Sequence, residues 1–135
     1  MRTPILLLAF VFASAACASS HLELKGSCNY SIKGSSITLR AAGIYNQNAG
    51  GHSGSLRIAL WATQRPYDGG VINGWRVGEA EAGNVNGGYH KSNFAATVNV
   101  HRPPHGRYYM VMTLSEYDNG WRQIDYQKFP TPFTF

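Results

Sequence analysis

The chain has 135 residues, a length that fits a single domain, and a formal net charge of +5 at pH 7. Its 12 Lys and Arg residues are scattered without any run of three, whereas nucleic-acid binding favours positive charge clustered on one face or arm. The composition therefore argues against a nucleic-acid partner. We expect a mildly basic surface with a weak attraction to acidic glycans or anionic lipid headgroups.

The first residues have the order typical of a secretory signal. A basic start at Met1–Thr3 precedes the apolar run Ile5–Ala13, and small residues follow it. The apolar run is far shorter than the ~20 residues of a membrane-spanning helix, and no later segment approaches that length. We therefore expect residues 1–18 to be a signal peptide, cleaved near residues 16–18, and residues 19–135 to form one exported domain of the bacterial cell envelope.

Two modes of processing remain open around Cys17. The segments Ala13–Ala15 and Ala16–Ala18 both offer a small-x-small site to ordinary signal peptidase. The segment Ser14–Cys17 resembles a bacterial lipobox, although its first position is Ser where such a motif usually carries an aliphatic residue. That resemblance implies that Cys17 is lipidated and that acyl chains alone hold the domain at a membrane. Cys28, the second of the two cysteines, then stands alone, or pairs with Cys17 if cleavage precedes Ala16.

Glycine-rich turns separate short alternating runs in the rest of the chain, and this spacing predicts an antiparallel two-sheet sandwich of about seven to eight strands. In the run 55–63, Leu56, Ile58 and Leu60 fall on one face. Gly78 interrupts the run 74–82, which predicts an edge strand or a bulge there. The strands predicted in chain order are 28–32, 36–46, 55–63, 74–82, 93–101, 107–117 and 121–129.

The last third of the chain carries three further signals. The run 107–117 is apolar on both faces, as a central strand covered on both sides would be. The step Asn119-Gly120 predicts a hairpin in which both residues take positive φ. The tail 129–135 contains two prolines and therefore cannot be a central strand.

The segment Pro103-Pro104-His105-Gly106-Arg107-Tyr108-Tyr109-Met110-Val111 carries a resemblance to a known family. It resembles the corner between strands E and F of immunoglobulin-like and fibronectin-III-like sandwiches, and especially the adhesion-related domains of bacterial surface proteins. The resemblance implies two sheets in Greek-key order, with Tyr108 or Tyr109 hydrogen-bonded back to the backbone. It covers about residues 36–129 and implies no specific activity, because this fold hosts many unrelated ones.

The longest loop-like segment, 64–75, is the first candidate for ligand binding. It carries Arg65, Tyr67, Asp68 and Trp75, and exposed aromatic rings beside polar groups are what sugar or peptide recognition needs. The alternative is that Tyr67 and Trp75 fold back and cap the sandwich.

The hairpin around Asn119-Gly120 is the second candidate. It carries Glu116, Tyr117 and Trp121, and an immunoglobulin-like topology places it at the same end as residues 46–54. Its oxygen donors lack the spacing of a known calcium loop, so an ordinary hairpin tip is the better interpretation.

No motif for nucleophilic catalysis occurs, and the histidines have no metal-ligand spacing. We therefore expect a non-enzymatic binding or structural module without a cofactor or a metal. Its ligand would be a glycan, a peptide or an envelope protein. The alternative is an unrecognised hydrolase, or an inhibitor of an enzyme, that uses Asp68, Glu116 or the histidines.

Overall fold

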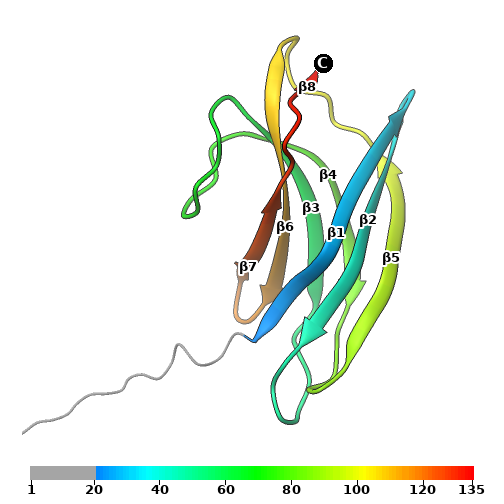
Figure 1. Ribbon diagram of the computed structural model, residues 1–135, viewed down its shortest axis with the longest axis vertical. Coiled ribbons are helices and arrows are strands. Elements are labelled where there is room, and N and C mark those ends of the chain that lie inside the picture. The colour runs from blue at the N-terminus through cyan, green and yellow to red at the C-terminus, as the bar shows by residue number, and fades with distance from the viewer. Residues whose placement is uncertain (1–20) are drawn as a thin grey trace, which may run out of the picture.

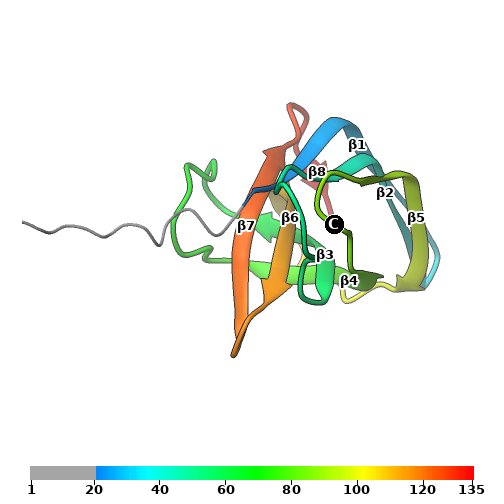
Figure 2. The same cartoon turned by 90° about the horizontal axis from the view of Figure 1, so that it is seen from below.

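The computed structural model describes residues 21–135, which form two antiparallel β-sheets packed face to face (Figure 1, Figure 2). This confirms the predicted all-β sandwich, and the described residues contain no helix. The described residues therefore include no helix that could cross a membrane. The predicted signal peptide and Cys17 lie outside the described residues.

One sheet has three strands in the order β1-β2-β5, and the other has the order β4-β3-β6-β7 with β8 pairing to β6. Strands distant in the sequence therefore become neighbours, which is the Greek-key order expected. The strands are β1 (Leu22–Lys33), β2 (Ser36–Asn46), β3 (Leu56–Thr63), β4 (Trp75–Gly83), β5 (His90–Asn99), β6 (Arg107–Tyr117), β7 (Trp121–Lys128) and β8 (Phe133–Thr134).

The largest departure from the predicted strands is at β1, which begins at Leu22 and not at Cys28. A register shift between Lys25 and Cys28, with Gly26 at φ 76°, breaks the alternation there. The sequence did not predict the first half of the strand, because a bulge moves later side chains to the other face and so interrupts the alternating pattern.

The core lies between the sheets and follows the predicted alternation of β3. Leu56, Ile58 and Leu60 are fully buried. In β6, Met110 and Met112 face the core, and Val111 and Thr113 on the other side are also buried, whereas Tyr109 and Tyr117 on that side are exposed. The predicted cover on both faces therefore holds only for the middle of the strand. The remaining fully buried large side chains include Ile37, Leu39, Ile44, Val77 and Leu114.

The strand β4 is both an edge strand and a bulged one, as Gly78 predicted. The register between β3 and β4 shifts beside Leu60, where Gly78 is the facing residue. A Cβ on Gly78 would lie 2.8 Å from Cγ2 of Ile37 in the opposite sheet. Glycine therefore allows the two sheets to approach closely at this edge.

The corner before β6 is fixed by Tyr108. Its hydroxyl donates a hydrogen bond to the carbonyl oxygen of Pro104 at 2.7 Å, and its ring is buried. Of the two tyrosines that the resemblance left open, Tyr108 makes the bond to the backbone, while Tyr109 points outward. The crossover between the sheets is thus pinned a few residues before the central strand.

Candidate functional site

The loop between β3 and β4 (residues 64–74) stands out from the body of the sandwich (Figure 1, Figure 2). Tyr67 holds it against β7: the ring packs edge-on against Tyr126 with centroids 4.7 Å apart. Its hydroxyl donates to the carbonyl oxygen of Gly70 and accepts a bond from Nε2 of Gln123 at 2.8 Å. Only 6% of Tyr67 is exposed, so it anchors the loop and does not offer a free ring.

The local sequence allows the loop to turn around Tyr67. Gly69 and Gly70 have φ of 103° and 80°, values that residues with a Cβ rarely adopt. At the start of the loop, the hydroxyl of Thr63 donates to the carbonyl oxygen of Arg65 at 2.7 Å. The loop therefore has both a fixed base and a tight turn at its tip.

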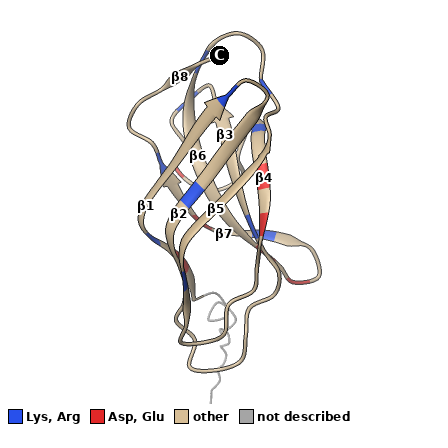
Figure 3. Cartoon of the chain, turned by 90° about the vertical axis from the view of Figure 1, so that its right-hand side faces the viewer, with Lys and Arg blue, Asp and Glu red and all other residues tan. Residues whose placement is uncertain are grey.

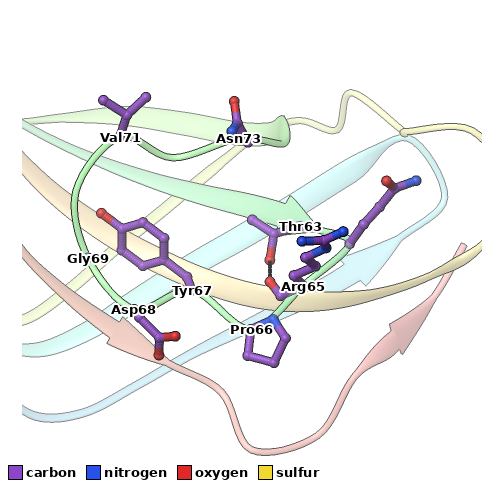
Figure 4. Close-up of a pocket in the computed structure, with 9 residues that line it drawn as sticks. Thr63, Arg65, Pro66, Tyr67, Asp68, Gly69, Val71 and Asn73 are labelled. Carbon is purple, nitrogen blue, oxygen red and sulfur yellow. Dashed lines mark hydrogen bonds between the residues drawn. The ribbon is translucent and has the colours of Figure 1, made fainter.

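Two hollows lie on either side of this anchored tyrosine. The first, about 440 Å³, is lined by the loop itself, with Arg65, Asp68 and Asn73 as its main polar groups (Figure 4). The second, about 340 Å³, lies between the loop and the outer face of β6 and β7. Its lining is mostly apolar and consists of Pro66, Tyr67, Tyr109, Met110, Val111, Lys128, Phe129 and Pro130. Pro66 and Tyr67 belong to both hollows, so the two adjoin.

Charges and an exposed ring stand at the edges of these hollows. Lys128 Nζ lies 3.5 Å from Asp68 Oδ1, and both side chains are largely exposed, so the pair adds little stability. Arg65 has no ion-pair partner within residues 21–135. Tyr109 is 40% exposed and lines the apolar hollow. Polar groups that can orient a ligand therefore surround an apolar surface that can bury part of it.

Trp75, the fourth residue of the first candidate group, lies apart from both hollows. It begins β4, and its ring packs edge-on against Tyr108 at 5.5 Å between centroids. Trp75 thus extends the aromatic cluster around the Tyr108 corner while 39% of it remains exposed.

The second candidate group lies at the tip of the β6–β7 hairpin, where Asn119 and Gly120 take positive φ (56° and 134°) as predicted. Glu116 accepts a bond from the backbone N–H of Gly54 at 2.8 Å, which confirms that the hairpin and residues 46–54 share one end. Glu116 is therefore occupied in holding the neighbouring loop.

Two exposed aromatic rings, Tyr117 and Trp121, stand beside that bond. They pack edge-on at 5.5 Å between centroids, and the Arg57 guanidinium lies 3.9 Å from the Trp121 ring centroid. This arrangement fixes the Trp121 ring by a cation–π contact. Among the described residues, no group of three or more His, Cys, Asp or Glu side chains is placed to hold a metal ion.

The two candidate groups lie at opposite ends of the five-stranded sheet. The β3–β4 loop follows Thr63, which pairs with Tyr109, whereas the hairpin follows Tyr117 at the other end of β6. At ~3.3 Å per strand residue the two ends are roughly 26 Å apart. Arg65, Tyr67 and Asp68 thus form one site, and Glu116, Tyr117 and Trp121 form another.

The sequence did not predict the β6 and β7 side of the loop site. Tyr109, Lys128 and Pro130 line it, but they lie 35 or more positions after the end of the loop. The one local signal was the pair Tyr108-Tyr109, since adjacent strand residues face opposite ways and only one ring can enter the core.

Cys28 is the described residue with the clearest change in acidity. Burial, and secondarily the negative charge of Asp125, raise the pKa of the Cys28 thiol from 9.0 to about 11. The thiol therefore stays protonated at neutral pH and is a poor nucleophile.

No known family model matches the chain, and no curated protein is similar to it. Among solved structures it is similar to a β-glucosidase from Kluyveromyces marxianus, with a TM-score of 0.43, 9% identity, and coverage of 85% of this chain and 15% of the enzyme. For the glucose complex of that enzyme the TM-score is 0.42 and the identity 9%, with coverage of 85% of this chain and 14% of the enzyme. For β-glucosidase 3B from Thermotoga neapolitana in complex with glycerol, the TM-score is 0.38 and the identity 10%, with coverage of 76% of this chain and 16% of the enzyme. The chain spans less than a fifth of each enzyme, and at these TM-scores the likeness carries no argument about function.

Proposed function

We propose that this protein is an exported binding module of the cell envelope that takes a glycan or a peptide at its β3–β4 loop. The observation that carries the proposal is the pair of adjoining hollows, one polar and one apolar, on either side of Tyr67. Ligand sites combine an apolar lining with a few placed polar groups, and volumes of about 300–1,000 Å³ are typical of them.

The anchoring of Tyr67 supports binding because it orders the loop before a ligand arrives. A loop that is already held by Tyr126 and Gln123 loses little conformational freedom on binding. Tyr109 then supplies an exposed ring for stacking, and Asp68 and Lys128 supply charged groups that orient polar atoms of the ligand. Partly buried tyrosines of this kind are frequent anchors of interfaces.

The export part of the proposal rests on the leader at residues 1–18. A lipid on Cys17 would hold the domain at a membrane while the whole sandwich remains outside the bilayer. The binding loop would then face the periplasm or the exterior, where envelope glycans and peptides occur.

The alternative of a hydrolase that uses Asp68 and Glu116 gains no support from their positions. Asp68 faces Lys128 at one end of the sheet, and Glu116 bonds Gly54 at the other. Two acids that catalyse one bond cleavage must flank it within about 10 Å.

Calorimetric titration of the mature protein tests the proposal. The panel consists of neutral oligosaccharides of glucose and of N-acetylglucosamine, and of uncharged tetrapeptides with and without proline. For the tightest ligand, Tyr109→Ser weakens affinity roughly fivefold or more, because it removes the stacking ring. Tyr109→Phe retains the ring and keeps the affinity.

Tyr89→Ser is the matched control, since Tyr89 is exposed but lies away from both hollows. Equal losses in Tyr109→Ser and Tyr89→Ser, or no binding across the whole panel, would count against the proposed site.

A further inference from the structure

Small polar side chains occupy the centre of the outer face of the β1-β2-β5 sheet. Across its centre, Ser31, Thr38 and Thr97 lie side by side in register, and the Thr38 and Thr97 hydroxyls are 2.9 Å apart. Arg40 is the one charged residue of β2, and Figure 3 shows that charged segment near the middle of the face. The centre of the face is thus rich in hydroxyl groups around one arginine, while Lys33 and Lys25 lie toward its two ends.

A hollow of about 300 Å³ lies beside Arg40 on this face. Two backbone irregularities border it: the β1 bulge at Gly26, with φ 76°, and Asn93 of β5, with φ 55°. Between them stands Ala42, whose side chain is too small to fill the space. Its polar lining comes from Ser27, Asn29, Arg40 and Asn93.

Arg40 is exposed, and within residues 21–135 its side chain has no ion-pair or hydrogen-bond partner. Its direct neighbours in register are Asn29 of β1 and Ala95 of β5, and both are uncharged. The only acidic residue of the three strands is Glu23, near the start of β1, where it contacts Lys25 and Gln47. No carboxylate of this sheet therefore competes for the guanidinium.

We infer that this hollow binds an acidic sugar through one carboxylate and its neighbouring hydroxyl groups. The planar guanidinium of Arg40 matches a carboxylate with two parallel hydrogen bonds. The amides of Asn29 and Asn93 and the hydroxyl of Ser27 can each donate and accept, as the hydroxyl groups of a sugar ring require. The site is on the opposite sheet from the β3–β4 loop, so it does not depend on the function proposed above.

The surroundings of Arg40 favour a sugar over a lipid headgroup. The exposed large hydrophobic side chains are Val71, Trp75, Tyr89, Tyr109, Tyr117 and Trp121. None of these lies on β1, β2 or β5, so the face offers no side chain that would insert into a bilayer. Hydroxyl and amide groups around one cation suit a flat polar ring.

The experiment titrates the full mature chain with trimers of galacturonate, with hyaluronan oligomers and with N-acetylneuraminate oligomers. The methyl ester of trigalacturonate is the uncharged counterpart of the first probe. We expect at least one acidic probe to bind, and to bind roughly tenfold or more tightly than its ester, because hydrogen bonds to a charged group are the stronger ones. Arg40→Gln abolishes that preference.

Two variants distinguish binding at this hollow from a general attraction of acidic probes to the positively charged protein. Asn93→Gly keeps the positive φ but removes the amide, and it weakens binding severalfold. Arg107→Gln removes the same charge from an exposed arginine outside this sheet, and it changes affinity less than twofold.

Three outcomes would overturn the inference: equal losses in the two arginine variants, equal affinity for acid and ester, or no binding of any acidic probe. Arg40-dependent binding to phosphatidylglycerol vesicles without sugar binding would also overturn it, in favour of a lipid headgroup.

Discussion

Asp125 on β7 accepts a hydrogen bond from the backbone N–H of Leu24 on β1, with 2.8 Å between the two heavy atoms. These strands are the edges of different sheets. Nearby, the amide of Gln127 donates to the carbonyl oxygen of Gly26 at 2.9 Å. Side chains of one sheet thus satisfy backbone groups of the other, and they close one side of the sandwich where no strand pairing is possible.

We expect Asp125→Ala to lower the free energy of unfolding by about 1–3 kcal/mol, because the variant leaves the N–H of Leu24 without its partner. Urea unfolding measures this, with an unchanged dependence on urea concentration. Asp118→Ala is the control, since Asp118 is an exposed hairpin carboxylate in a long ion pair. Equal effects of the two substitutions would show that the bond to Leu24 is unimportant.

The same carboxylate bears on the acidity of Cys28. Because burial and Asp125 raise the thiol pKa to about 11, we expect slow alkylation by iodoacetamide at pH 8 in a Cys17→Ser chain. Asp125→Ala removes one of the two causes and increases that rate. A rate at pH 8 equal to that of a free thiol would contradict the burial.

The raised pKa of Cys28 also sets a direction for stability. The unfolded thiol releases its proton near pH 9, whereas the folded thiol keeps it until about pH 11. The contribution of this group to stability is therefore complete below pH 9 and is lost as the pH rises from 9 to 11. Comparison with Cys28→Ser in urea unfolding at several pH values isolates the effect.

The corner tyrosine gives a further prediction. Tyr108→Phe removes only the hydroxyl that bonds Pro104, and we expect a loss of about 1–2 kcal/mol in the free energy of unfolding. Tyr109→Phe removes a hydroxyl that has no partner in the described part of the chain, and it should leave stability unchanged. Denaturant unfolding of both variants decides whether Tyr108 alone pins the crossover.

Processing of the predicted signal peptide gives a further prediction. Intact-mass measurement of the protein isolated from membranes should show a chain that begins at Cys17 with the added mass of its acyl chains. Cys17→Ser should then move the protein to the soluble fraction. An unmodified chain that begins at Ala16 or Ser19 indicates ordinary signal peptidase, and a chain that retains Met1 would contradict export.

Much of the fold could be predicted because its signals are local. The alternation of Leu56, Ile58 and Leu60 defines a strand face, and Asn119-Gly120 defines a hairpin. The first half of β1 escaped prediction because the bulge at Gly26 shifts the alternation. The two-residue strand β8 escaped because its pairing with Arg107 and Tyr108 is decided by the fold and not by its own residues.

The candidate site was predicted only in part, and Tyr67 shows why. A tyrosine in a loop beside Asp68 and Gly69 has the composition of an exposed contact residue. Its burial depends on Gln123 and Tyr126, which lie more than fifty positions away. Long-range packing of this kind leaves no local pattern, so the residue that orders the site could not be distinguished from one that binds the ligand.

We propose above all that the ordered loop around Tyr67 receives the ligand. Amide NMR spectra recorded during titration with the tightest oligosaccharide or peptide test it most directly. We expect the shifts to concentrate in residues 64–74, 109–111 and 128–129, which line the two hollows. Shifts centred on the hairpin at residues 117–121, with the loop unchanged, would contradict it.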